Sequence, residues 1–286
     1  MSISTSNAKN IFFLGQNSHG TAEPWEYRRQ RISSRCPEER IAVVMECPTA
    51  DMILYELRKQ TSGEEYLKKA LMTSCYWWVR SKQFFGFLSH LPSHAHIFGI
   101  DAPFEIANHR IFISKLGLSD ISEYNMMSRL LEVDMINNVT ISELSPVQRE
   151  RILYQKLKVI LTGEYDYIYI ICHNFHATKL SWFDFLSLCQ RLLLEKTTDL
   201  TVFSVGSFAR TMEFISTDGD RLLNRHTLSG SLKDLSESSF EVKMVSSLYR
   251  SETSDALPLV VSIPEHFDEI VIRDNESAVC MEELHA

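Results

Sequence analysis

Residues 10–46 constrain the fold of this chain more than any other stretch. They contain two short apolar runs, at 11–14 and 41–45, which end at Gly15 and Glu46. The polar segment between the runs has the length of a helix, and this pattern is typical of a βαβ unit with parallel strands. We therefore expect two parallel strands that are neighbours in a sheet and end at the same edge.

The polar residues after these two runs indicate a functional site. In parallel sheets the loops at the carboxyl ends of the strands carry the functional side chains, so we expect His19 and Glu46 to lie at one edge. A histidine that faces a carboxylate can accept a proton near neutral pH. His19 is therefore a candidate general base. A histidine that only hydrogen-bonds its own turn is the equally weighted alternative.

Two later apolar runs also end in polar residues. The run at 97–100 is followed by Asp101, and the run at 167–172 is followed by His173 and His176. These strand ends are expected at the same edge as the first two. Two histidines after one strand, together with the histidine after the first strand, favour a functional site over a hydrogen-bonded turn.

Composition and charge exclude several classes of protein. The chain has 286 residues and 44% hydrophobic residues, which is ordinary for a globular protein with a sizeable core. A net charge of -8 argues against a nucleic-acid partner. No N-terminal stretch has the pattern of a signal peptide, and no apolar run approaches the roughly 20 residues that cross a bilayer. We expect a cytoplasmic protein with no membrane partner.

The cysteines and histidines do not form a metal motif. The six cysteines are scattered without a C-x-x-C pair, so we expect reduced thiols. His90, His94 and His96 are close in sequence, but Pro92 separates the first from the other two. Zinc normally needs a third protein ligand beside His94 and His96. We predict no metal and no cofactor, with a site at His94 and His96 as the alternative.

The spacing of apolar residues predicts how the chain is organised. From 104 to about 155 it is helical and glycine is nearly absent, which indicates a helical insertion or lid. We expect an α/β fold, with a central, mostly parallel sheet flanked by helices. Residues 1–104 would form the first part of the α/β domain, 105–160 the insertion and 161–286 the remainder. Neither a Gly-x-Ser-x-Gly elbow nor a phosphate-binding loop is present.

Four segments of the chain resemble one known family, the erythromycin esterases, with the related succinoglycan biosynthesis-type proteins. LGQNSHGTAEPWEYRRQRI at 14–32, followed by IAVVMECP, is similar to the family's LGExTHGTxEF, basic helix and strand ending in Glu. FGID at 98–101 resembles its YGLD, and HNFH at 173–176 resembles its HN-x-H. FDEIVIRDNESA at 267–278 resembles its closing strand. The likeness is thin between about 105 and 165.

The resemblance implies an enzyme that hydrolyses an ester or lactone of a small molecule without a metal. His19 would deprotonate a water molecule, and Glu46 would orient His19 or the water. Arg28 matches a basic position that the family uses for binding in its site. Arg28 and a histidine of the HN-x-H motif, His173 or His176, would stabilise the oxyanion.

Further residues are expected to meet the substrate. Trp78 is a candidate for the floor of the site, because aromatic side chains line small-molecule sites, although core packing explains it equally well. Lys179 would add a positive donor close to the HN-x-H motif. The resemblance places Gln16 and Glu23 near the substrate, and Asp101 would orient a ligand or cap the next segment.

One difference from the family's pattern concerns the proposed base. Gln16 stands where the family usually has Glu, and an amide carries no negative charge that would raise the basicity of a histidine. Three outcomes stay open: a slower esterase, a tailoring enzyme of natural-product biosynthesis that performs elimination or acyl transfer, and a non-catalytic binding protein.

Overall fold

A computed structural model describes most of the chain outside several loops and the two ends. The described residues are 8–58, 77–103, 125–180, 185–195, 199–215, 221–225, 240–242, 259–261 and 266–281. No helix among them is long and apolar enough to cross a membrane. The first part of the predicted insertion, up to residue 124, lies outside the described residues.

Six parallel strands form the centre of the molecule and confirm the predicted α/β fold. They are β1 (Lys9–Gln16), β2 (Ile41–Pro48), β3 (His96–Asp101), β4 (Tyr167–His173), β5 (Leu200–Ile215) and β9 (Glu269–Glu276). Their order is β3-β2-β4-β1-β5-β9, because Val205 of β5 pairs with β1 on one side and with β9 on the other. β6 (Arg221–Arg225) pairs antiparallel with the end of β5. β7 (Phe240–Val242) and β8 (Leu259–Val261) form a separate two-stranded sheet.

The order of the strands corrects one expectation. β1 and β2 are parallel, but β4 lies between them and pairs with both. The prediction that they are neighbours was wrong because a strand more than 100 residues later in the chain separates them. Because β4 lies between β1 and β2, the HN-x-H segment at its end lies in the middle of the row of carboxyl strand ends. Gln16 at the end of β1 pairs with His173 at the end of β4.

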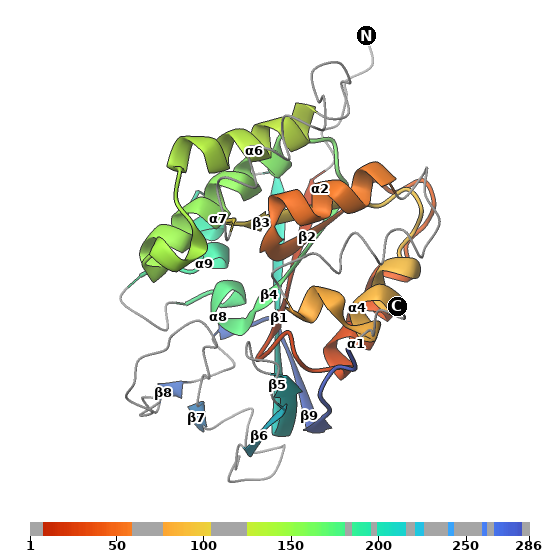
Figure 1. The fold of residues 1–286 in the computed structure, drawn as a ribbon, viewed down its shortest axis with the longest axis vertical. Helices are drawn as coiled ribbons and strands as arrows, with labels where there is room; N and C mark the ends of the chain where they lie inside the picture. Colours follow the sequence, from red (N-terminus) through yellow and green to blue (C-terminus); the bar gives the residue numbers. More distant parts are fainter. Residues whose placement is uncertain are drawn as a thin grey trace, which may run out of the picture.

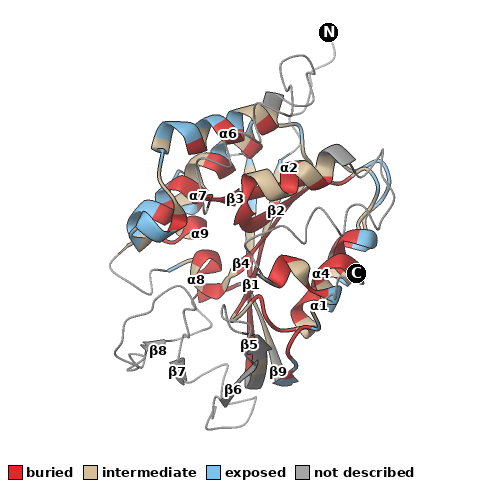
Figure 2. Cartoon of the chain, viewed as in Figure 1, coloured by how far each residue is buried: buried red, intermediate tan, exposed pale blue. Residues whose placement is uncertain are grey.

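Helices cover both faces of the sheet (Figure 1). On one face lie α1 (Glu23–Ser33), η1 (Trp77–Arg80) and α4 (Lys82–Ser89). On the other lie α6 (Asn125–Asn137), α7 (Pro146–Leu161), the short α8 (Asn174–Ala177) and α9 (Leu188–Leu194). α2 (Thr49–Arg58) contributes to both hydrophobic cores. Figure 2 shows that the buried residues follow the strands and the sides of the helices that face them.

The described part of the predicted insertion packs directly on the sheet. Ser145 begins α7 with a capping box, and Pro146 occupies its first turn, where a missing N–H costs nothing. Leu153, Leu157 and Ile160 then join the core on the face of the sheet. The short turn η4 (Ile141–Glu143) links α6 to α7. The division of the chain at 104 and 160 stays a prediction.

An irregularity in β2 sets the position of Glu46. The pairing of β2 with β3 shifts register between Met45 and Pro48, so Glu46 falls in a bulge. Bulges change the direction of a side chain and are frequent beside active sites. Gly99 of β3 permits this approach, because a Cβ at that position would clash with the carbonyl oxygens of Cys47 and Pro48.

Candidate active site

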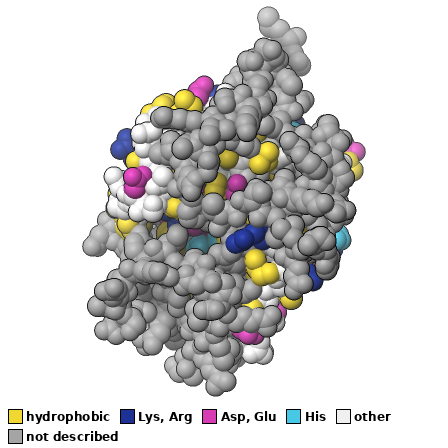
Figure 3. Space-filling view, in the orientation of Figure 1, with side chains coloured by type: hydrophobic (Ala, Val, Ile, Leu, Met, Phe, Trp, Pro, Cys, Tyr) yellow, Lys and Arg dark blue, Asp and Glu magenta, His cyan; other side chains and the backbone are white. Residues whose placement is uncertain are grey.

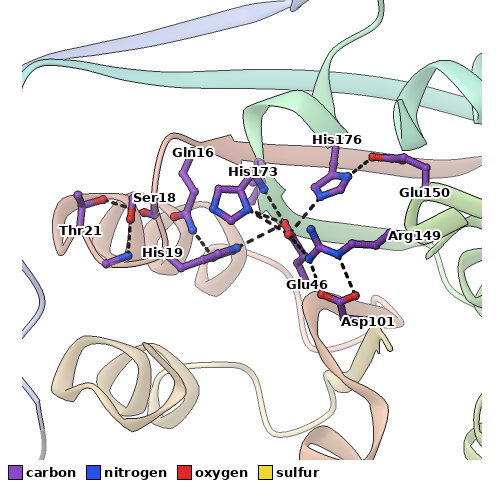
Figure 4. Close-up of polar contacts among 12 residues, drawn as sticks. Gln16, Ser18, His19, Thr21, Glu46, Asp101, Arg149, Glu150, His173 and His176 are labelled. Atoms are coloured by element: carbon purple, nitrogen blue, oxygen red, sulfur yellow. Dashed lines mark hydrogen bonds and ion pairs between the residues drawn. The ribbon is translucent and has the colours of Figure 1, made fainter. Parts of the chain in front are cut away.

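The buried carboxylate of Glu46 lies at the centre of a cluster of positively charged and imidazole groups (Figure 4). Both of its oxygens lie within 3.1 Å of His173 Nδ1, and the His173 backbone N–H donates to Oε2 at 2.8 Å. Arg149 Nη2 donates to Oε1 at 2.7 Å. His19 Nε2 is 3.4 Å from Oε2, and His176 Nε2 is 3.1 Å from Oε1. The carboxyl ends of β1, β2 and β4, with helix α7, therefore meet at one point.

The surroundings of Glu46 keep its carboxylate ionised. Burial acts to raise the pKa of Glu46, but His173, His176 and Arg149 outweigh burial and hold the pKa well below its usual value. An ionised carboxylate only accepts hydrogen bonds. Every nitrogen that bonds to Glu46 therefore carries its proton toward it.

His19 is buried and neutral. Burial, followed by the neighbouring His173, lowers the pKa of His19 to about 3. Its Nε2 faces the Glu46 carboxylate and carries the ring proton, so its Nδ1 is an acceptor. The side-chain amide of Gln16 lies against that Nδ1 and donates to it. Trp78 stacks on the His19 ring with centroids 4.6 Å apart, so both nitrogens and one face of the ring are in contact.

His176 has the opposite charge state. Burial acts to lower its pKa, but the carboxylates of Glu150 and Glu46 outweigh burial and raise the pKa to about 9. Its Nδ1 bonds to Glu150 and its Nε2 faces Glu46. His176 is therefore an imidazolium between two carboxylates at neutral pH.

His173 is the most exposed of the three histidines. Its side chain is 19% exposed, compared with 4% for His19 and 1% for His176. Its Nδ1 carries a proton toward Glu46, so its Nε2 holds the lone pair. No described residue hydrogen-bonds to that Nε2. Figure 3 shows a histidine side chain near the middle of one face of the molecule, with a Lys or Arg side chain to its right.

Helix α7 supplies two residues of the cluster that no sequence pattern predicted. Arg149 bonds to Asp101 through Nε at 3.1 Å and Nη2 at 2.5 Å, and also to Glu46. Glu150, fully buried, bonds to His176. Neither residue belongs to a motif or follows a strand, so their sequence context carries no signal beyond two charged residues in the first turns of a helix.

Several predicted residues lie within or beside the cluster. Gln16 and Trp78 contact His19, and Asp101 reaches Glu46 through Arg149.

Arg28 is buried, and its charge acts on His19 and on Glu46 of the cluster. Its Nη2 donates to the Leu14 carbonyl at 3.2 Å, and its guanidinium lies over the ring of Trp25. Its Nη1 has no hydrogen-bond partner among the described residues. Burial lowers the pKa of Arg28 to about 9.

Two predicted substrate contacts bond elsewhere in the structure. Glu23 accepts hydrogen bonds from the backbone N–H and the hydroxyl of Ser277, both at 2.8 Å. Lys179 is paired with Asp268 at 2.5 Å. Both contacts tie the segment at 266–281 to the rest of the fold, and the structure does not bring either side chain into the Glu46 cluster.

The described residues contain one group with the composition of a metal site. Ligand atoms of His19, Glu46 and His173 lie within 4.8 Å of one another. Glu46 already accepts hydrogen bonds from Arg149 and from the His173 backbone, and a metal ion would be repelled by that guanidinium. The donor set therefore fits a network of hydrogen bonds better than a cation. His96 instead bonds to Glu56 at 3.1 Å.

A second feature, a surface cleft of about 310 Å³, lies between α1 and α4. Glu26 and Arg29, which line it, are paired with each other. Trp25, also in the lining, stacks on Trp78, which in turn stacks on His19. Two indole rings therefore separate this cleft from the Glu46 cluster.

Comparisons with known proteins show the fold. No family model matches the sequence, and no curated protein matches it. A solved succinoglycan biosynthesis protein has a TM-score of 0.64 at 11% identity, over 96% of this chain and 90% of that one. A Bacillus cereus protein has a TM-score of 0.59 at 12% identity, over 97% and 95%. A mutant of the erythromycin esterase EreC, in its open conformation, has a TM-score of 0.53 at 14% identity, over 98% and 93%. This chain has the fold of these proteins.

Proposed function

We propose that this protein hydrolyses an ester or lactone bond of a small, natural-product-like molecule with water activated by an imidazole. One observation carries the proposal. The ionised carboxylate of Glu46 holds three imidazoles and a guanidinium at the carboxyl ends of parallel strands, and one of the imidazoles is partly exposed. A histidine oriented by a buried carboxylate is the arrangement that general-base catalysis requires.

The other residues supply positive charge for the oxyanion. When water attacks an ester carbonyl, negative charge develops on the carbonyl oxygen, and one well-placed donor contributes about 3 kcal/mol to lowering the barrier. Arg28 supports this role because its buried guanidinium has an Nη1 without a partner among the described residues. An unpaired buried charge is costly, so an anionic oxygen that reached it would be bound strongly. The charge of His176 is paired with the carboxylates of Glu46 and Glu150.

The solved structures with this fold bear on the reaction class. EreC is named an erythromycin esterase, and its fold supports ester hydrolysis. Another is named a succinoglycan biosynthesis protein, which supports the second candidate, a biosynthetic tailoring step such as elimination or acyl transfer. The amide of Gln16, which lowers the basicity expected of His19, is compatible with this second candidate and with a binding protein.

A labelled-water experiment separates these candidates. The purified protein is incubated in H₂¹⁸O with activated aryl esters and a panel of macrolactones, beside the variant Glu46→Gln. Hydrolysis predicts one ¹⁸O atom in each acid product and a loss of rate on the order of 10²–10⁴ in the variant. Turnover without ¹⁸O would show elimination or acyl transfer. Equal rates for the two proteins would contradict a role for this site, provided that both unfold cooperatively.

A further inference from the structure

The Glu46 cluster contains three histidines, and the proposed hydrolysis needs one unprotonated nitrogen that a water molecule can reach. The number of available lone pairs is set by the hydrogen bonds of each ring. Because Glu46 is an acceptor only, each ring that bonds to it carries a proton on the nitrogen that faces it. The group that lies against the other nitrogen of each ring therefore decides whether that ring has a lone pair for water.

Two of the three rings have no accessible lone pair. The second nitrogen of His19, Nδ1, accepts the amide proton of Gln16, and the ring is 96% buried under Trp78. The second nitrogen of His176 bonds to the Glu150 carboxylate, so this ring is protonated on both sides. Only His173 presents a second nitrogen that no described residue occupies, and its side chain, 19% exposed, is the most accessible of the three.

We infer that His173, and not His19, accepts the proton of the attacking water. Gln16 prevents His19 from acting as the base, because it occupies Nδ1 and holds His19 in its Nε2-protonated form. This inference rests on the proposed hydrolysis. His19 then acts as a positioning residue, since its Nε2–H and its contact with Trp78 hold the Glu46 carboxylate toward His173.

The step balances without a further reactant. His173 Nε2 takes one proton from water, while the water oxygen bonds to the ester carbonyl carbon and the carbonyl electron pair moves to its oxygen. When the tetrahedral intermediate collapses, the bond from carbon to the alkoxy oxygen breaks. The proton on His173 Nε2 passes to that oxygen, and the products are an acid and an alcohol. His173 keeps its Nδ1 proton throughout, and the Glu46 carboxylate accepts that hydrogen bond and stabilises the transient imidazolium.

Two substitutions test the assignment, because each keeps the hydrogen bond to Glu46 and removes only the ring's basicity. His173→Asn retains a donor near the Nδ1 position, and His19→Gln retains one near the Nε2 position. We expect His173→Asn to lower kcat/KM on the order of 10²–10⁴-fold and His19→Gln to lower it less than about tenfold. His90→Ala, at an exposed histidine outside the cluster, controls for general effects. The reverse ranking of the first two variants would overturn the assignment.

A second readout does not depend on activity. In ¹⁵N-labelled protein, imidazole signals identified with the single variants report which nitrogen carries the proton. We expect His19 to stay neutral and Nε2-protonated between pH 5 and 8, and His173 to carry its proton on Nδ1 when neutral. In Gln16→Glu, the new carboxylate should attract a proton to His19 Nδ1, and His19 should then titrate in that range. A wild-type His19 that is protonated on Nδ1 would overturn the inference.

The two readouts keep the inference distinct from the proposed function. If wild-type protein hydrolyses no ester but shows the expected tautomers, the hydrolase proposal fails and the assignment of the accessible nitrogen stands. If hydrolysis occurs and depends on His19 rather than His173, only the present inference fails.

Discussion

At the scale of single residues, the site depends on one negative charge that orders several rings. Glu46 is the only group that contacts His19, His173 and His176 among the described residues. His19 and His176 differ in charge because their second partners differ, an amide for His19 and a carboxylate for His176. Identical side chains therefore reach opposite charge states within one cluster.

The charge states of His176 and His19 predict how stability depends on pH. The pKa of His176 is raised from 6.5 to about 9, so its stabilising contribution is complete below pH 6.5 and is lost as pH rises toward 9. The pKa of His19 is lowered to about 3, so its contribution is complete above pH 6.5 and is lost as pH falls. Each slope is at most about 1.4 kcal/mol per pH unit.

Urea unfolding of the wild type and His176→Gln between pH 6.5 and 9 measures the alkaline limb. We expect the free energy of unfolding of the wild type to fall across this range, and that of the variant to fall less. Parallel curves would mean that His176 binds no extra proton in the folded state.

At the scale of elements, side chains of helix α7 pair with the charged side chains at the carboxyl ends of the strands. Arg149 and Glu150 are adjacent on this helix, yet they bond to different groups. Arg149 bonds to Glu46 and Asp101, and Glu150 bonds to the ring of His176. The segment that the sequence predicts as an insertion or lid thus contributes directly to the site.

Removal of the Arg149 charge should destabilise the protein strongly. Arg149→Met leaves two buried carboxylates without their guanidinium, and breaking a buried pair from one side costs about 3–5 kcal/mol. The matched control is Arg40→Met, because Arg40 pairs with Glu164 and Asp166 with a side chain that is 52% exposed. An exposed pair contributes about 0–1 kcal/mol. Urea unfolding that showed equal losses for the two variants would contradict the role of Arg149.

The bulge in β2 gives a second prediction at this scale. In Gly99→Ala the new Cβ meets backbone carbonyl oxygens of Cys47 and Pro48, which cannot rotate away, so we expect a loss of about 1–3 kcal/mol. Gly86→Ala is the control, because its Cβ would have no neighbour within 4 Å in helix α4. A glycine-to-alanine change at a compatible position stabilises by about 0.4–1 kcal/mol. Thermal unfolding should shift in opposite directions, and a common direction would contradict the close approach at Gly99.

At the scale of the whole molecule, local patterns predicted the strands and the ends at which polar residues gather. The apolar runs at 11–14, 41–45, 97–100 and 167–172 all lie in parallel strands of one sheet. Their spatial order was not predictable from periodicity, because β4 enters between β1 and β2 through long-range pairing. For the same reason, the partnership of Glu46 with Arg149 has no local signature.

Above all, we propose that the reacting ester binds beside Nε2 of His173. A crystal structure with a phosphonate analogue of the best ester substrate tests this claim most directly, because the analogue imitates the tetrahedral intermediate. We predict a phosphonyl oxygen within hydrogen-bond distance of His173 Nε2, with His173 Nδ1 still bonded to Glu46. A phosphonate bound only in the cleft between α1 and α4, with the His173 ring unoccupied, would contradict the account.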